Sequence, residues 1–255
     1  MRRILLTALV GAVAMLGGSA GAAAAEIKVL TAGAFKEILL ATVPDFEKAT
    51  GHKVTLDNAT VGVLTKRIED GEAFDLAVMG PAAIDQLTAK GKFAAGSQVA
   101  LARVGVGVVV KDGMPKPDVG TVDAFKRALL AAASVAYIDP KAGGSSGIYI
   151  AKLLQQLGIA DQVNAKAKLI QGGAVATHIA KGEAELGLHQ ISEILPVKGA
   201  VLVGPLPAEI QNYTVYAAAV GASARDATAA KALVARLAGP ETAAVLKAKG
   251  MEPAP

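Results

Sequence analysis

Short apolar segments alternate with amphipathic segments of helical period from residue 26 onward. The first set consists of strand-like residues 26–33, 52–57 and 74–80, with helix-like residues 34–51, 61–71 and 81–91 between and after them. We expect Pro44 to kink or break the first helix and Gly51 to end it. Nearly continuous apolar strands between helices predict a mostly parallel sheet that helices cover on both faces.

Two longer segments interrupt this alternation, "VALARVGVGVVVK" at 99–111 and "YTVYAAAV" at 213–220. Between them, helices and strands alternate again, and two helices at 226–239 and 240–250 end the chain. The pattern predicts an α/β protein of two lobes, joined by two extended crossings near 104–110 and 212–219. The first lobe would comprise 26–105 plus 212–255 and the second 106–211, and a hinge would let them close on a ligand.

The first 25 residues have the features of a signal peptide. The basic start "MRR" precedes a short apolar run, and "AGAAAAE" supplies small residues for cleavage. The apolar run is too short for a comfortable membrane span. The chain contains no cysteine, which excludes disulfides, thiol catalysis, cysteine metal sites and a lipid-anchored cysteine. We therefore expect a free protein in a bacterial periplasm.

Composition argues against several kinds of partner and cofactor. The net charge is only +4, aromatic residues make up 4% of the chain, and no basic tract is present, so we expect neither nucleic acid nor membrane lipid as a partner. The histidines at 52, 178 and 189 lack the spacing of metal ligands, and no G-x-G-x-x-G or Walker sequence occurs. We expect no metal and no cofactor.

Four strand-to-helix loops, at 31–37, 58–66, 141–149 and 171–176, are the candidates for a binding site. In open α/β sheets, ligands bind outside the carboxyl ends of the strands. The unpaired N–H groups and the dipole of a helix N-terminus attract anions, and small residues let a ligand approach the backbone. Several such loops facing one cleft predict an anion site without lysine or arginine. Taken singly, Thr60, Ser145 and Ser146 are more typical of ordinary helix caps, and the agreement of several loops on one side is what favours the anion site.

Residues 143–147 also spell G-x-S-x-G, the motif of a serine hydrolase with Ser145 as the nucleophile. That motif requires the serine on a tight turn directly between strand and helix, followed by an acid and then a histidine. Here "PKAGG" separates the strand from Ser145, and no histidine follows His189. We therefore expect no catalytic step, and a secreted hydrolase remains a lesser alternative.

The chain resembles the periplasmic molybdate-binding proteins of ABC importers, a branch of the type II solute-binding proteins. The resemblance is carried by "EIKVLTAGAFKEIL", "LTKRIEDGEAFDLAVMG", "IDPKAGGSSGIYIAKLLQQLG", "KGEAELGLHQ" and "LAGPETAAVLKAKG". It implies a two-lobed clamshell that delivers a captured anion to a membrane permease. It also implies a backbone donor at Ser146 and another near Gly172 or Gly173.

The departures from the family concern its hydroxyl donors. Ala34 and Val61 stand where the family usually has serine, and Gln190, preceded by His189, stands where a tyrosine is common. Each lost hydroxyl removes a hydrogen bond worth about 1.5–3 kcal/mol to a charged ligand. We therefore predict a different anion, a small organic di- or tricarboxylate, with molybdate or tungstate as the alternative.

The predicted chain is a monomeric solute-binding protein that closes around its ligand. A sensory subunit that signals to a membrane receptor is a further alternative, which genes for a permease and an ATPase beside its own would exclude. The predicted ligand-binding residues come from all four loops and from the end of a later strand: Ala34, Phe35, Thr60, Val61, Gly62, Ser145, Ser146, Gly147, Gly172, Gly173, His189 and Gln190.

Overall fold

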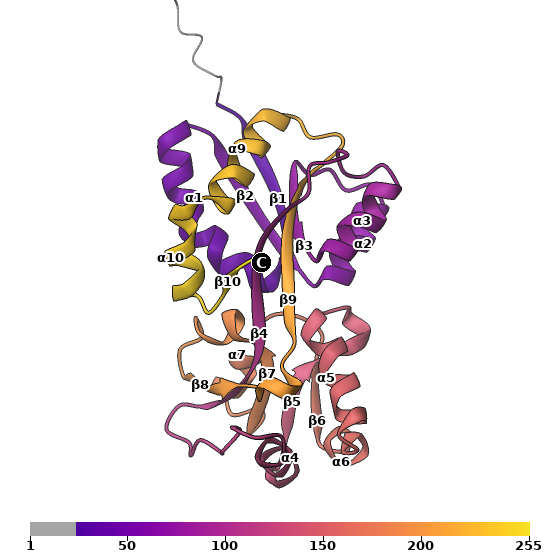
Figure 1. The fold of residues 1–255 in the computed structure, drawn as a ribbon, viewed down its shortest axis with the longest axis vertical. Coiled ribbons are helices and arrows are strands. Elements are labelled where there is room, and N and C mark those ends of the chain that lie inside the picture. Colours follow the sequence, from indigo (N-terminus) through magenta and orange to yellow (C-terminus); the bar gives the residue numbers. More distant parts are fainter. Residues whose placement is uncertain (1–23) are drawn as a thin grey trace, which may run out of the picture.

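The computed structural model describes residues 24–255, and it has two α/β halves between which β4 and β9 pass (Figure 1). The expected signal peptide lies almost wholly outside the described residues. None of the helices in residues 24–255 combines the length and apolar character needed to cross a membrane.

The sheet of the first half has the strand order β2-β1-β3-β9-β4. β1 (Glu26–Ala32) is parallel to β2 (Lys53–Ala59) and β3 (Leu76–Met79), whereas β9 (Tyr213–Val220) is antiparallel to β3 and to β4 (Val99–Lys111). Side chains alternate along β1, so that Val29 packs on one face and Leu30 on the other. The helices divide accordingly: α1 (Lys36–Thr50), α9 (Ala227–Ala238) and α10 (Pro240–Ala248) cover one face, and α2 (Val61–Glu69) and α3 (Pro81–Ala89) the other. The short β10 (Glu252–Pro253) pairs with β4.

The second half repeats this arrangement with the order β4-β7-β5-β6. β5 (Val135–Ile138) is parallel to β6 (Ala167–Ile170) and β7 (Leu186–Gln190), and β8 (Ala200–Pro205) pairs antiparallel with β4. One face packs on α4 (Val122–Ala131), α5 (Ser145–Gln156) and α6 (Ala160–Asn164), and the other on α7 (Val175–Ala180) and α8 (Ile191–Ile194). Three short 3-10 turns complete the described elements: η1 (Gly33–Phe35), η2 (Pro140–Ala142) and η3 (Ala208–Ile210).

β4 belongs to both sheets, and its partners change at Val106. Up to Gly105 it pairs with β9, and from Val106 onward it pairs with β7. The Gln211 side chain accepts a hydrogen bond from the Val106 N–H at 2.9 Å and donates one to the Val106 carbonyl at 3.0 Å, so it takes the place of a strand between β9 and β8. Core residues of the first half come from 27–104 and 216–251, and those of the second from 106–206. The predicted lobe boundaries, at 105/106 and 211/212, lie between these groups of core residues. That the two lobes move as separate bodies stays a prediction.

We expected a kink or a break at Pro44, and the break is wrong, because α1 runs from Lys36 to Thr50 without interruption. A kink there stays a prediction. Pro44 and Leu40, four residues before it, are both exposed, so water can satisfy the carbonyl that loses its helical N–H partner. The buried stripe on the opposite face holds the helix against the sheet. Gly51 ends α1 with a φ of 76°, as predicted.

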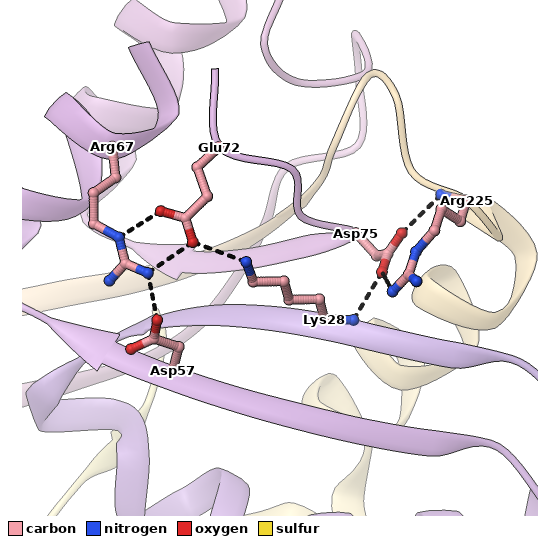
Figure 2. A network of polar contacts seen from close by, with 6 residues as sticks. All are labelled: Lys28, Asp57, Arg67, Glu72, Asp75 and Arg225. Atoms are coloured by element: carbon pink, nitrogen blue, oxygen red, sulfur yellow. Dashed lines mark hydrogen bonds and ion pairs between the residues drawn. The ribbon is translucent and has the colours of Figure 1, made fainter. Parts of the chain in front are cut away.

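A polar network ties the strands of the first half together (Figure 2). Arg67 of α2 binds both Glu72 and Asp57, and the Lys28 ammonium lies 2.9 Å from Glu72. Beside it, Asp75 accepts hydrogen bonds from the Lys28 N–H at 2.7 Å and from the Arg225 N–H at 2.7 Å, and it pairs with the Arg225 guanidinium. Asp75 therefore joins β1, the start of β3 and the segment before α9.

Candidate ligand-binding site

A cavity of about 250 Å³ lies between the two halves and is lined by residues from both. It is smaller than the roughly 300–1,000 Å³ of sites for drug-sized ligands, which suits a small metabolite. Its lining residues come from the helix starts, from the ends of β1, β2, β5 and β7, and from the middle of β9: Ala32, Gly33, Ala34, Asn58, Ala59, Thr60, Val61, Val63, Ile138, Gly144, Ser145, Ser146, Gln171, Gly172, Gly173, His189, Gln190, Glu193 and Tyr216.

The two halves touch beside this cavity through backbone atoms. The Gly62 N–H donates to the Gly143 carbonyl at 3.2 Å, and the Thr60 hydroxyl donates to the Ala142 carbonyl. A Cβ atom on Gly62 would lie 2.9 Å from the Gly143 Cα, a distance that real side chains do not show. Glycine at position 62 therefore permits this approach of α2 to the η2–α5 loop.

A second contact between the halves involves α8. The Ser192 hydroxyl is buried and donates to the Ala34 carbonyl at 2.8 Å. Glu193 extends to Gly33, where an added Cβ would lie 2.6 Å from Glu193 Oε1. The structure thus has the two halves in contact on both sides of the cavity.

Helix N-termini supply most of the polar groups that the backbone presents to the cavity. Thr60 caps α2 by accepting a hydrogen bond from the Val63 N–H, and α5 begins after Gly144 with no side-chain cap. The first N–H groups of α5, at Ser145 and Ser146, have no intrahelical acceptor. No lysine or arginine of the described residues lines the cavity. Any anion bound here would depend on amide donors and helix dipoles.

Two side chains at the end of β7 are buried at the cavity with unused hydrogen-bonding atoms. His189 is 2% exposed, and its Nδ1 has no partner among residues 24–255. Gln190 is 1% exposed; its Nε2 donates to the Thr214 hydroxyl at 2.9 Å, and its Oε1 has no partner in the same part of the chain. Buried polar atoms seldom lack partners, so both atoms are candidates to contact a ligand.

Glu193 brings a carboxyl group into the cavity, 3.3 Å from His189 Nε2. Burial raises the pKa of Glu193 to about 8, although the charge of Lys36 acts in the opposite direction. Burial also lowers the pKa of His189 to about 3. Near pH 7 the histidine is therefore neutral and most of the glutamate is protonated, so their contact is not an ion pair.

Tyr216 of β9 lines the cavity from the first half. Burial and the nearby Glu193 raise the pKa of its phenol, which keeps the hydroxyl protonated as a donor. With His189 and Glu193 it forms a cluster of three neutral groups that can each donate a proton to a hydrogen bond.

Most of the predicted ligand-binding residues line this one cavity. The exceptions are Phe35, Gly62 and Gly147, which are not among its lining residues. Phe35 is fully buried in the core of the first half, and Gly62 faces Gly143. Gly147 packs against the Ile138 carbonyl. The roles of the lining residues in binding remain predictions.

The residues that sequence reasoning missed are chiefly Glu193, Tyr216, Asn58 and Gly33. Glu193 lies in a four-residue helix that directly follows β7, too short to leave a periodic signal. Tyr216 lies in a segment predicted only as a hinge crossing. Asn58 lies in one of the predicted loops, two residues before Thr60. Its polar side chain is the feature that could have pointed to a place in the binding site.

Ser145 does not occupy a nucleophile elbow. The 3-10 turn η2 and two glycines separate β5 from Ser145, which is the first residue of α5. The motif requires a sharp turn directly from strand to helix. The loop therefore fits helix-start binding and not acyl transfer.

Comparisons with family models, curated proteins and solved structures agree on the family of this chain. A family model described as bacterial extracellular solute-binding protein matches residues 27–252. An aconitate isomerase from a Pseudomonas species is 34% identical over 90% of this chain and 88% of its own length. A molybdate-binding protein from Azotobacter vinelandii is 30% identical, with 90% of each chain covered. The solved structure of an Azotobacter vinelandii periplasmic molybdate-binding protein has a TM-score of 0.76 at 22% identity, covering 88% of this chain and 98% of that one.

Proposed function

The chain belongs to the family of bacterial extracellular solute-binding proteins, with the type II periplasmic binding protein fold, and we propose from this that it captures a small organic di- or tricarboxylate in the cavity between its halves. The observation that carries the proposal is the make-up of that cavity. Helix N-termini from both halves meet there with neutral donors and no cation of the described residues.

The donors suit a carboxylate. A carboxylate oxygen accepts well from backbone N–H groups at a helix start, which α5 provides at Ser145 and Ser146 because it has no side-chain cap. At the start of α2 the Gly62 and Val63 N–H groups already have acceptors. The Gln190 amide can turn so that Oε1 accepts from the Thr214 hydroxyl and Nε2 faces the solute. Protonated Glu193 and Tyr216 add two more donors.

The apolar lining favours a carbon skeleton over a bare oxyanion. Ala34, Val61, Val63 and Ile138 lie among the donors. A tetrahedral oxyanion needs donors toward every oxygen, whereas the carbon chain of a polycarboxylate gains from apolar contact. The relative named aconitate isomerase adds support, and aconitate is the first ligand to test.

Molybdate or tungstate is the second candidate. The relative named as a molybdate-binding protein, together with a solved structure of a tungstate-binding protein of the same fold, favours it. Backbone donors at Ser146 and Gly173 would serve a tetrahedral anion equally well.

An anion screen by thermal shift, followed by calorimetric titration, tests the proposal. A ligand whose free concentration is 100 times its Kd adds about 2.7 kcal/mol to the free energy of unfolding. We expect aconitate or a related polycarboxylate to raise Tm and to titrate with one site. Tight binding of molybdate with no response to polycarboxylates would replace this proposal with the second candidate.

We propose that the protein works outside the cytoplasm and delivers its bound solute to an ABC permease in the membrane. Its membership of the extracellular solute-binding family supports this. Only closure brings donors of both halves onto one ligand, so a permease could recognise the loaded state by shape. A sensory role would use the same closure, and uptake measured in a strain lacking the protein would separate the two.

A further inference from the structure

Glu193 is difficult to explain by anion binding alone. It is the only carboxyl group among the described residues that line the cavity. Its side chain is 15% exposed, and His189 Nε2 lies 3.3 Å from its Oε2. Protonated Glu193 can donate to an anionic ligand, but its ionised fraction repels that ligand, so a site selected only for affinity would gain from an amide at this position.

We propose that Glu193 moves a proton on the bound ligand, so that the cavity interconverts unsaturated polycarboxylates by shifting their double bond. This inference rests on the proposed function, since it needs a polycarboxylate in the same cavity. It departs from the expectation of no catalytic step.

The step is a proton transfer along three carbons. The Glu193 carboxylate takes a proton from the saturated carbon between a carboxylate and the C=C bond. The C–H electron pair forms a new double bond, and the electrons of the old one move onto the far carbon and its carboxylate oxygen. Glu193 then returns the proton to that far carbon. No electrons leave the ligand, Glu193 ends as it began, and in a tricarboxylate such as aconitate the shift can exchange the cis and trans forms.

The surroundings of Glu193 suit this role. Negative charge that develops on the ligand carboxylate would meet the N–H groups at the start of α5, where preorganised donors stabilise it best. A pKa near 8 allows Glu193 both to accept and to return a proton near neutral pH. His189 is a positioning residue, since its Nε2 contacts the carboxyl group and leaves Nδ1 for the ligand.

The test follows trans-aconitate by proton NMR in the presence of wild-type protein, and calorimetry measures its binding in the same buffer. Glu193→Gln keeps the size and hydrogen-bonding capacity of the protonated side chain but cannot take a proton. We expect the variant to bind aconitate within tenfold of wild type and to form cis-aconitate about 10²–10⁴-fold more slowly. Glu209→Gln, on the exposed η3 turn, is the matched control and should convert at the wild-type rate.

Three outcomes separate the proposals. Wild-type binding without conversion, or conversion that Glu193→Gln leaves intact, overturns the inference and leaves the proposed function standing. Failure of every polycarboxylate to bind removes the proposed function and the inference with it. Binding with conversion that depends on Glu193 supports both.

A pH profile of wild type keeps the inference testable if the variant does not fold, which circular dichroism would reveal. The charged or titratable groups near Glu193 are His189 on β7, Lys36 on α1 and Tyr216 on β9. The bound anion disfavours ionised Glu193 further. At saturating aconitate the rate should therefore rise with pH, with a midpoint at or above about 8. A rate that is flat or falls between pH 6 and 9 contradicts the proposal.

Discussion

At the scale of single residues, Glu193 couples ligand affinity to pH. Its raised pKa means that it is mostly protonated at pH 7 and ionised above about 8. Ionisation turns a donor into a negative charge beside the ligand. We expect the affinity for a polycarboxylate to fall by up to tenfold per pH unit above pH 8. Titrations from pH 6.5 to 9.5 check this, and Glu193→Gln should show no such fall.

Gly62 offers a residue-scale test of contact between the halves. In Gly62→Ala the new methyl group would clash with Gly143, while alanine suits the first turn of α2 better than glycine by up to about 1 kcal/mol. The ligand-free variant should therefore match or exceed wild type in Tm, yet bind ligand at least tenfold more weakly in calorimetry. Gly80→Ala, where nothing lies within 4 Å of the new methyl group, should leave affinity unchanged. Unaltered affinity in Gly62→Ala would mean that the contact plays no part in closure.

At the scale of elements, Asp75 connects three segments of the first half. Its side chain is 2% exposed; burial raises its pKa, but hydrogen bonds from Lys28 and Arg225 outweigh that effect and lower it overall. Asp75→Asn turns one acceptor into a donor that faces a backbone N–H, of Lys28 or of Arg225, and removes the negative charge that pairs with the Arg225 guanidinium. We expect a loss of about 3 kcal/mol in the free energy of unfolding at pH 7, measured with urea.

The sign of the pH dependence of this effect follows from the lowered pKa. Stability from Asp75 is fully present above the ordinary aspartate pKa of 3.8 and is lost as pH falls through the lower value of the folded state. The difference in stability between wild type and Asp75→Asn should thus shrink as the pH falls below 3.8. Asp70→Asn, in an exposed ion pair with Lys66, should cost no more than about 0.5 kcal/mol at any pH.

Much of the fold could be predicted because most elements carry a clear period and clear ends. The crossing segments were predicted at 99–111 and 213–220, the bounds of β4 and β9. The elements that were missed, such as α6 and α8, are five and four residues long, so they show barely one turn of helical period. Pro44 misled because a sequence does not reveal that its helix position faces solvent.

The site was predictable in part for a similar reason. Ser145 and Gly172 follow strands whose carboxyl ends must meet at one edge of a sheet, and both line the cavity. Tyr216 and Glu193 reach the cavity only through the packing of the two halves. Local pattern contains no information on such long-range placement.

At the scale of the whole molecule, closure should be visible in solution. The structure has the halves in contact at Gly62–Gly143 and Ser192–Ala34, and β4 and β9 are the predicted hinge between them. We expect small-angle X-ray scattering to show a smaller radius of gyration when saturating polycarboxylate is added to ligand-free protein. The same addition to Gly62→Ala should produce less contraction. A radius that does not change with ligand in wild type would argue against hinge closure.

The placement of β9 between β3 and β4 has a consequence for biosynthesis. β9 is an inner strand of the first sheet that a ribosome makes late, and α9 and α10, which cover one face of that sheet, are made after it. The first half therefore cannot be completed until the end of synthesis, although all core residues of the second half, within 106–206, have been made by then. Until the final forty or so amino acids are made, the sheet of the first half lacks β9, and α9 and α10 do not cover its face, so we expect this half to complete its folding only after the whole chain has been synthesised.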